Sequence, residues 1–238
     1  MFDCPLRSVV FDIGDTLVDA TRIEKTSLER VMGRLGLSAQ KHPFPLSYRR
    51  VAGQWVASDH NRLFGLPFEM FQTAWRAAGI KDKDAHVGWR VYQTCVRARI
   101  RPRPRLTGLF RTLKERGLRL GIVSDGTTPE QEETLQRLGV LTYLDAMVVS
   151  DTVGATKPDP RLFERVLEDL GISPADARAA VYVGDNWERD VEGAHQSRMR
   201  AVYVVRETDA LADTGGVPVI RFRELHKLLN LLDQKGWT

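Results

Sequence analysis

Cysteine is scarce in this chain, whose 238 residues include only Cys4 and Cys95. Two cysteines are too few for a disulfide framework, and they lack the spacing of a zinc site. Neither has a paired histidine motif nearby, so a catalytic thiol is not expected. The sequence therefore excludes a disulfide-stabilised scaffold and is typical of a protein from a reduced compartment.

Long apolar runs are also lacking. No stretch is long enough to span a bilayer, and residues 1–10 lack the apolar segment of a signal peptide. We therefore expect a cytoplasmic protein with no membrane partner, which works as a monomer or homodimer.

Neither charge dominates strongly, because 35 basic and 31 acidic residues leave a net charge of +4. This balance favours an anionic substrate through long-range attraction. The densest basic run extends from Arg97 to Arg105, and its Pro102 and Pro104 indicate a stiff, solvated linker. A nucleic-acid-binding patch is the alternative interpretation of this run, but no nucleic-acid partner is expected.

Short apolar runs rich in β-branched residues recur along the chain. They are apolar throughout rather than alternating, which predicts strands buried on both faces of a parallel sheet. Helical patterns separate them, so the predicted fold class is α/β, with a Rossmann-like, mostly parallel core. The runs are residues 8–11, 118–123, 146–149, 179–183, 201–205 and 217–220, and Pro218 indicates an edge position for the last.

One long segment interrupts this alternation. Residues 18–99 contain helical patterns but no convincing strand, and three of the five tryptophans lie there. The simplest account is an all-helical insert after the first strand. The predicted domains are a catalytic core of residues 1–17 plus 100–238 and a helical insert of residues 18–99. The helices expected in the insert are residues 23–35, 46–64, 68–78 and 84–99.

Reactive side chains follow several of the predicted strands. Asp12, Ser124 and Asp185 lie at strand ends, and the loop from Ser150 leads to Lys157. The carboxyl ends of parallel strands meet at one edge of a sheet, where ligands bind. A carboxylate can attack phosphorus, and Mg²⁺ prefers carboxylate and phosphate oxygens. The pattern therefore indicates phosphoryl transfer at this edge.

Four segments also resemble, in chain order, the four motifs of the haloacid dehalogenase-like hydrolases. Any one of these motifs is weak, but the ordered set is specific and covers residues 7 to 206. The segments are Phe11 to Leu17 (FDIGDTL), Val123 to Gly126 (VSDG), Lys157 to Pro160 (KPDP) and Val183 to Asp190 (VGDNWERD).

The resemblance implies an Mg²⁺-dependent hydrolase of a small phosphorylated metabolite, acting through an aspartyl-phosphate intermediate. Asp12 is then the nucleophile. Ser124, Asp125 and Lys157 are the expected phosphate-binding residues, with Ser124 and Lys157 also counted as catalytic. The implied metal site consists of Asp12, the carbonyl of Gly14, Asp185 and Asp190.

The first motif departs from the family pattern. Phosphatases of this family usually carry a second Asp two residues after the nucleophile as the general acid and base, but Gly14 occupies that position and Asp15 follows it. Three interpretations are open. Asp15 serves as the acid/base, the acid/base is lost or comes from the insert, or the reaction is a different one.

The different reaction is cleavage of a carbon–halogen or carbon–phosphorus bond by the same nucleophile. The fourth motif weighs against the halogen route, because dehalogenases of this type work without metal. The phosphorus route needs a lysine from the insert, and the candidates are Lys25, Lys41, Lys81 and Lys83. Outside enzymes, Gly14 is consistent with a low-turnover phosphate-binding regulatory protein.

The insert resembles the helical cap that sets specificity in one branch of the family. Aromatic and basic residues within it are candidate substrate contacts, although helix packing or a solvated face is the preferred interpretation for any single one. These candidates are Arg49, Arg50, Trp55 and His60, with Arg62 and Trp75 beside them.

Overall fold

The computed structural model describes residues 5–38, 42–56, 68–209 and 213–237, with only the backbone described for residues 53–56 and 104. The chain divides into two compact units. The first consists of Met1–Val18 and Pro102–Thr238, and the second is Asp19–Arg101. Assigning the second unit the role of a cap stays a prediction.

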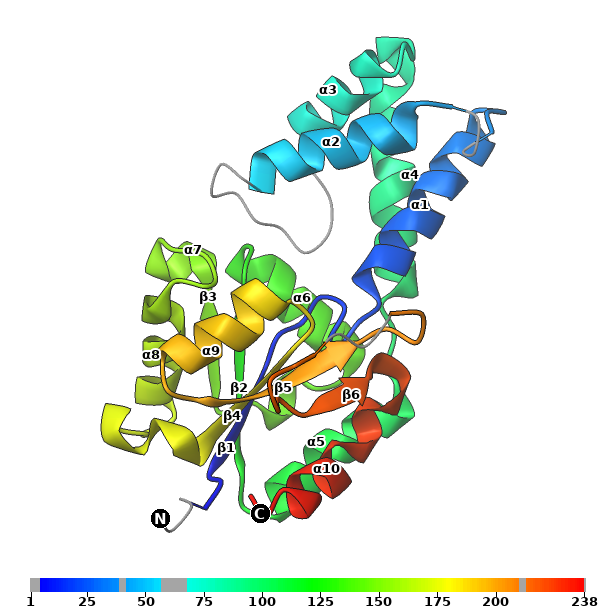
Figure 1. Cartoon of the computed structure of the whole chain (residues 1–238). Helices are drawn as coiled ribbons and strands as arrows, with labels where there is room; N and C mark the ends of the chain where they lie inside the picture. Colours follow the sequence, from blue (N-terminus) through cyan, green and yellow to red (C-terminus); the bar gives the residue numbers. More distant parts are fainter. Residues whose placement is uncertain (1–4, 39–41, 57–67, 210–212, 238) are drawn as a thin grey trace. The chain divides into compact units, whose positions relative to one another are not determined.

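A six-stranded sheet forms the centre of the first unit (Figure 1). All neighbouring strands pair in parallel, in the order β3-β2-β1-β4-β5-β6. The predicted α/β class is therefore confirmed, and the Pro218 run does form an edge strand. The strands are β1 (Ser8–Phe11), β2 (Arg119–Ser124), β3 (Ala146–Val149), β4 (Ala180–Gly184), β5 (Arg200–Val205) and β6 (Val219–Arg221).

Helices cover both faces of this sheet, as β1 illustrates. Val10 packs in the same core cluster as Leu162 and Phe163 of α8, whereas the ring of Phe11 stacks on Phe110 of α5 with centroids 5.0 Å apart. Successive residues of a strand face opposite sides, so an uninterrupted apolar run fills two hydrophobic layers. The helices of this unit are α5 (Pro104–Glu115), α6 (Thr128–Leu138), α7 (Ser150–Val153), α8 (Pro160–Asp169), α9 (Gly193–Gln196) and α10 (Leu228–Gln234).

Several turns tighten or widen relative to an α-helix. The helical segment after β4 begins as a π-helix, η4 (Trp187–Glu192), in which Val191 N–H donates to the carbonyl of Asn186 at 3.3 Å. Such wide turns are frequent at functional sites. The remaining short elements are the 3₁₀ turns η2 (Leu141–Tyr143), η3 (Pro174–Ala179) and η5 (Phe222–Lys227).

The second unit is helical in its described residues. Phe44, Tyr48, Phe71, Trp75 and Tyr92 form an aromatic core, and Trp75 is fully buried with its Nε1 donating to the carbonyl of Lys81 at 3.1 Å. Trp75 is thus a packing residue of this unit. The elements are α1 (Ala20–Arg34), α2 (Phe44–Val56), α3 (Phe68–Ala77), η1 (Asp82–Asp84) and α4 (Ala85–Arg99).

Membrane-crossing segments were also sought. Among the helices of the described residues, none combines the length and apolarity that crossing a bilayer requires.

Candidate active site

The central strands bring three of the predicted site residues to one edge of the sheet. Phe11 pairs with Val183 of β4 and with Ile122 of β2, so Asp12, Asp185 and Ser124 follow neighbouring strands near their carboxyl ends. The order of the sheet reverses between β1 and β4, which is where open α/β sheets bind ligands. The expected convergence of Asp12 and Asp185 is present in the structure.

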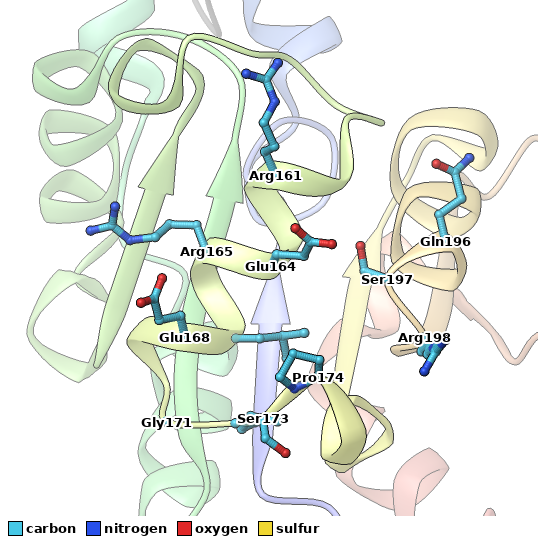
Figure 2. Close-up of a pocket in the computed structure, with 12 residues that line it drawn as sticks. Arg161, Glu164, Arg165, Glu168, Gly171, Ser173, Pro174, Gln196, Ser197 and Arg198 are labelled. Atoms are coloured by element: carbon cyan, nitrogen blue, oxygen red, sulfur yellow. The ribbon is translucent and has the colours of Figure 1, made fainter.

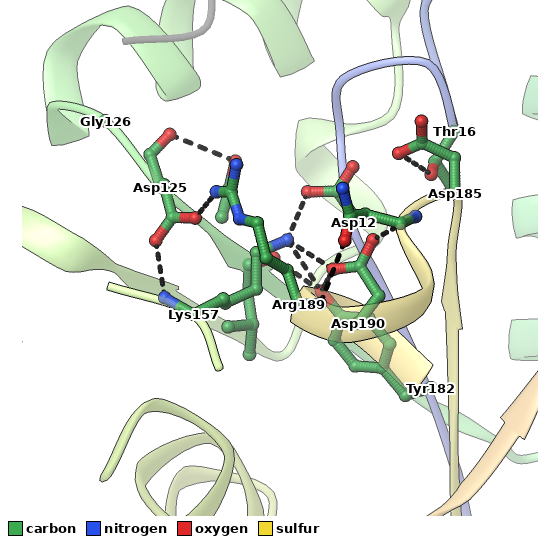
Figure 3. A network of polar contacts seen from close by, with 12 residues as sticks. Asp12, Thr16, Asp125, Gly126, Lys157, Tyr182, Asp185, Arg189 and Asp190 are labelled. Carbon is green, nitrogen blue, oxygen red and sulfur yellow. Dashed lines mark hydrogen bonds and ion pairs between the residues drawn. The ribbon is translucent and has the colours of Figure 1, made fainter. Parts of the chain in front are cut away.

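Lys157 is the cation at the centre of this edge (Figure 3). Its Nζ lies 2.6 Å from Asp12 Oδ1 and 2.6 Å from Asp190 Oδ1. It also donates to Tyr182 Oη at 3.1 Å, and Tyr182 Oη donates in turn to the Val123 carbonyl at 3.0 Å. All four side chains in this network are buried. Lys157 is therefore held between two carboxylates rather than exposed beside a proline turn.

Asp190 is fixed on both of its carboxylate oxygens. Oδ1 faces Lys157 and Tyr182, while Oδ2 accepts the N–H of Asn186 at 2.9 Å. The close approach of this carboxylate also requires a glycine in β4, since a Cβ on Gly184 would lie 2.5 Å from the Asp190 side chain. Asp190 is consequently better placed to orient Lys157 and a metal-bound water than to bind a metal directly.

The cluster carries more negative than positive charge. Three carboxylates, Asp12, Asp185 and Asp190, each place one oxygen within 4.8 Å of the others. Burial, together with the charges of Asp12 and Asp190, raises the pKa of Asp185 to about 8. Burial also raises the pKa of Asp12, although Lys157 opposes that rise. Asp12 and Asp190 already outweigh the single charge of Lys157, and ionisation of Asp185 adds to the excess, so the site favours an added cation.

The same network shifts the pKa of its two other titratable groups. Burial alone lowers the pKa of Lys157, but the charges of Asp12 and Asp190 outweigh burial and hold that pKa well above its usual range. Burial and the charge of Asp190 raise the pKa of Tyr182 well above its usual range. Lys157 therefore stays charged and the Tyr182 hydroxyl stays neutral throughout the physiological pH range.

Removing the cation from this cluster is expected to destabilise the fold. Lys157→Met leaves buried carboxylates without their partner, which costs about 3–5 kcal/mol in comparable buried pairs. Lys114→Met is a matched control, because Lys114 binds Asp145 at 2.6 Å on the surface, where both side chains are about one-third exposed. Such exposed pairs contribute about 0–1 kcal/mol. Urea unfolding of both variants measures the difference, and equal losses would contradict the burial argument.

Divalent-metal binding fits the donor set of this edge. Asp12 uses Oδ1 for Lys157, and among the described residues Asp185 accepts one weak side-chain hydrogen bond, from Thr16 Oγ1 at 3.5 Å. Each therefore has an oxygen to offer, and hard oxygen donors suit Mg²⁺. Gly14 lies in the same turn as Asp12, two residues further along the chain. A direct role for its carbonyl stays a prediction.

Ser124 and Asp125 lie buried at the end of β2. Ser124 Oγ donates to the Asp125 carbonyl at 3.4 Å, a long bond that a phosphate oxygen can replace. Asp125 Oδ1 accepts the backbone N–H of Lys157 at 3.0 Å, and Oδ2 pairs with Arg189. The Asp125 side chain thus fastens the third motif to the second, and phosphate binding by its backbone N–H stays a prediction.

The Asp15 side chain is not oriented to act as the general acid and base. Its backbone is left-handed, with φ of 53°, and its Oδ1 lies 2.6 Å from Nη2 of Arg206, which follows β5. This ion pair orients the Asp15 carboxylate toward Arg206. The structure therefore disfavours the interpretation in which Asp15 replaces the missing carboxyl at Gly14.

Three residues of this network were not among the predicted site residues. Tyr182 lies inside an apolar strand run, while Arg189 and Arg206 look like surface arginines until their partners are known. Only the spacing of Arg189, one residue before Asp190 in the fourth motif, pointed toward the site.

The proposed specificity residues belong to the second unit. Arg49 and Arg50 lie exposed on α2, and the lysines Lys25, Lys81 and Lys83 are also exposed there. The side chain of Trp55 lies outside the described residues, and so do His60, Arg62 and Lys41. A substrate contact by any of them stays a prediction.

Comparison with known proteins places this arrangement in a family. The family model for haloacid dehalogenase-like hydrolases matches residues 6–198. The chain is 31% identical to the glyceraldehyde 3-phosphate phosphatase of Methanothermobacter thermautotrophicus, over 95% of this chain and 100% of that protein.

Solved structures share the fold. The magnesium-bound HAD-hydrolase YfnB of Bacillus subtilis gives a TM-score of 0.72 at 18% identity, covering 96% of this chain and 99% of that one. A 2-haloacid dehalogenase from Pseudomonas syringae pv. Tomato gives 0.65 at 24% identity, covering 97% and 99%. At these identities the structures establish the fold alone. From its ordered motifs, its parallel sheet and the family match over most of its length, the chain belongs to the haloacid dehalogenase-like hydrolases.

Proposed function

We propose that this hydrolase cleaves a small phosphomonoester with Mg²⁺, using Asp12 as the nucleophile. The observation that carries the proposal is the cluster of Asp12, Asp185 and Asp190, in which the buried Asp12 and Asp190 share Lys157 and the half-buried Asp185 lies beside them. The phosphatase activity named for the archaeal relative supports the choice of phosphate.

Each residue has a role that follows from its position. Asp12 attacks phosphorus, which forms an aspartyl-phosphate and releases the alcohol, and water then cleaves this intermediate to inorganic phosphate. Lys157 Nζ, 2.6 Å from the nucleophile, offsets the negative charge that gathers there, and Ser124 donates to a phosphate oxygen. Mg²⁺ held by Asp12 and Asp185 would supply the remaining positive charge between carboxylate and phosphate.

The charge balance also separates phosphate cleavage from carbon–halogen cleavage. Carbon–halogen cleavage in this family works without metal, and its halide leaves without protonation. Additional carboxylates near the nucleophile would only repel this leaving anion. Phosphate cleavage instead gives both residues a role, because Asp185 would bind a divalent ion and Asp190 would orient Lys157 and a metal-bound water. We further propose that the unit Asp19–Arg101 is the cap that selects the substrate.

Metal dependence tests the proposal. Hydrolysis of an aryl phosphate should require added Mg²⁺ and stop when a chelator removes it. Chloride release from a 2-haloacid without metal would instead support the dehalogenase alternative. If Mg²⁺ and a phosphate mimic bind but no phosphoester is turned over, the regulatory alternative gains support.

Mg²⁺ affinity should depend on pH through Asp185. With its pKa raised to about 8, this carboxyl is protonated at pH 7 when metal is absent, and a bound cation must displace the proton. The apparent affinity is therefore expected to fall about tenfold for each pH unit below 8. Calorimetric titration in buffers of different ionisation enthalpy measures both the affinity and the released proton. A flat profile between pH 6 and 8 would contradict this assignment.

A further inference from the structure

The arginine–proline run that looked like a solvated linker contributes to a cavity in the first unit. Pro102, Arg103, Arg105 and Leu106 form one wall, and η5 supplies the other. The cavity has a volume of about 410 Å³, within the range of small-molecule sites. Its remaining lining residues are Arg223, Leu225 and His226.

The lining of this cavity is basic and contains no acid. Arg105 makes no ion pair within the part of the chain that the structure describes. Arg223 Nε lies 3.6 Å from Glu207 Oε2. His226 has Glu224 as its acidic neighbour, and Glu224 itself binds Lys227. Among the described residues, Arg105 and Arg223 have only Glu207 as an acidic ion-pair partner, which leaves an excess of positive charge at the cavity.

A larger groove provides a contrast. It lies between α8 and α9, has a volume of about 960 Å³ and presents both arginines and glutamates (Figure 2). Arg161 and Arg165 at its edge are already paired, with Asp159 at 2.8 Å and Asp169 at 2.9 Å. Glu164 and Glu168 balance the remaining positive charge, so this groove selects no ligand of one sign.

The basic cavity is also preorganised. Arg103 Nη1 donates to the Leu17 carbonyl at 2.9 Å, and its guanidinium lies 4.5 Å from the centre of the Phe222 ring. The 12-residue helix α5 starts at Pro104 and adds the positive end of its dipole. Guanidinium groups bind phosphate oxygens in pairs, and fixing one of them in advance reduces the entropy lost on binding.

We propose that this cavity is a second anion site, separate from the catalytic centre, which binds a small molecule carrying one or more phosphate groups. Arg103, Arg105 and Arg223 would contact the phosphate oxygens, with His226 beside them. Leu106, Leu225 and Pro102 provide apolar contact for the rest of the molecule. The site shares no residue with the Asp12 cluster, so it stands whether or not the proposed function does.

Inorganic pyrophosphate in metal-free buffer is the probe that tests this site. Without metal, the acidic catalytic cluster repels the anion, so calorimetric titration should report one saturable site in the basic cavity. Arg105→Glu and Arg223→Glu are each expected to weaken binding by at least about tenfold. Arg111→Glu is the matched control, because Arg111 is an exposed residue of the same helix, outside the cavity, and the substitution changes the net charge equally.

Binding through Arg111→Glu should stay within about twofold of wild type, since general attraction over the surface is screened by salt. Absence of saturable binding by the wild type, or equal weakening by all three variants, would overturn the proposal. A short single-stranded oligonucleotide distinguishes the source of the phosphate. If it binds far more tightly than pyrophosphate and depends on Arg105, the small-molecule assignment is wrong.

Discussion

Asp12→Asn should lower the turnover of a generic aryl phosphate by about a thousandfold or more, in line with losses of a nucleophile in other covalent mechanisms. Asp12 follows the central strand, is buried, and has Lys157 Nζ 2.6 Å from one oxygen. An amide keeps this size and shape but does not attack phosphorus. Steady-state release of phosphate with saturating Mg²⁺ measures the effect.

The same substitution should leave the fold intact, which separates chemistry from stability. Asp12 lies beside two further carboxylates, Asp185 and Asp190, and Lys157 still has Asp190 as a partner after the substitution, so removing one negative charge relieves repulsion. We expect the metal-free variant to unfold at the wild-type urea concentration or above it. Glu164→Gln, on the exposed side of α8, is the control and should change neither quantity. Unchanged turnover by Asp12→Asn would remove Asp12 as the nucleophile.

The sheet could be predicted from the sequence because its strands are buried on both sides. Runs such as that of β4 are apolar throughout, and Asp185 follows directly after Gly184. Strand ends then determine which side chains gather at one edge. Asp12, Lys157 and Asp190 could be placed in one site because the motif residues directly follow these runs or lie in the loops between them.

The contacts of long side chains could not be predicted in this way. Arg206 lies 191 residues from Asp15 along the chain, since 206 − 15 = 191, and only the β5 position brings them together. Tyr182 is indistinguishable in sequence from a packing aromatic, yet its hydroxyl contacts Lys157 at 3.1 Å. The wide turn at Val191 likewise adjoins the long-range contact of Asp190 with Lys157, which helix propensity does not reveal.

The lack of a side chain at Gly14 is expected to restrict which substrates this site turns over. An alkoxide is a poor leaving group unless a general acid protonates it, and such help is worth about a hundred- to ten-thousandfold. Position 14 has no side chain, and Asp15 is paired with Arg206. Among the described residues of the first unit, the other carboxylates of the site are already engaged. Asp12 and Asp190 contact Lys157, and Asp185 belongs to the group proposed to hold Mg²⁺. Substrates whose leaving group departs as a stable anion are therefore favoured.

Gly14→Asp is accordingly expected to raise turnover of an alkyl phosphate such as glycerol phosphate by about a hundred- to ten-thousandfold. An aryl phosphate with a nitrophenolate leaving group should change by less than about tenfold, because that anion leaves without a proton. Gly14→Asn is the control for size, since an amide is not a carboxylic acid and should raise neither rate. Initial rates on both substrates with saturating Mg²⁺ measure the difference.

The opposite pattern would identify Asp15 as the acid. If Gly14→Asp left the alkyl rate unchanged while Asp15→Asn lowered it a hundredfold, the Asp15 carboxyl must leave Arg206 during turnover. Arg206→Gln would then increase the alkyl rate by freeing that carboxyl. On the geometry of the 2.6 Å ion pair we expect neither effect, because the carboxylate is held toward Arg206. The alkyl-to-aryl rate ratio of these variants therefore decides which residue, if any, supplies the proton.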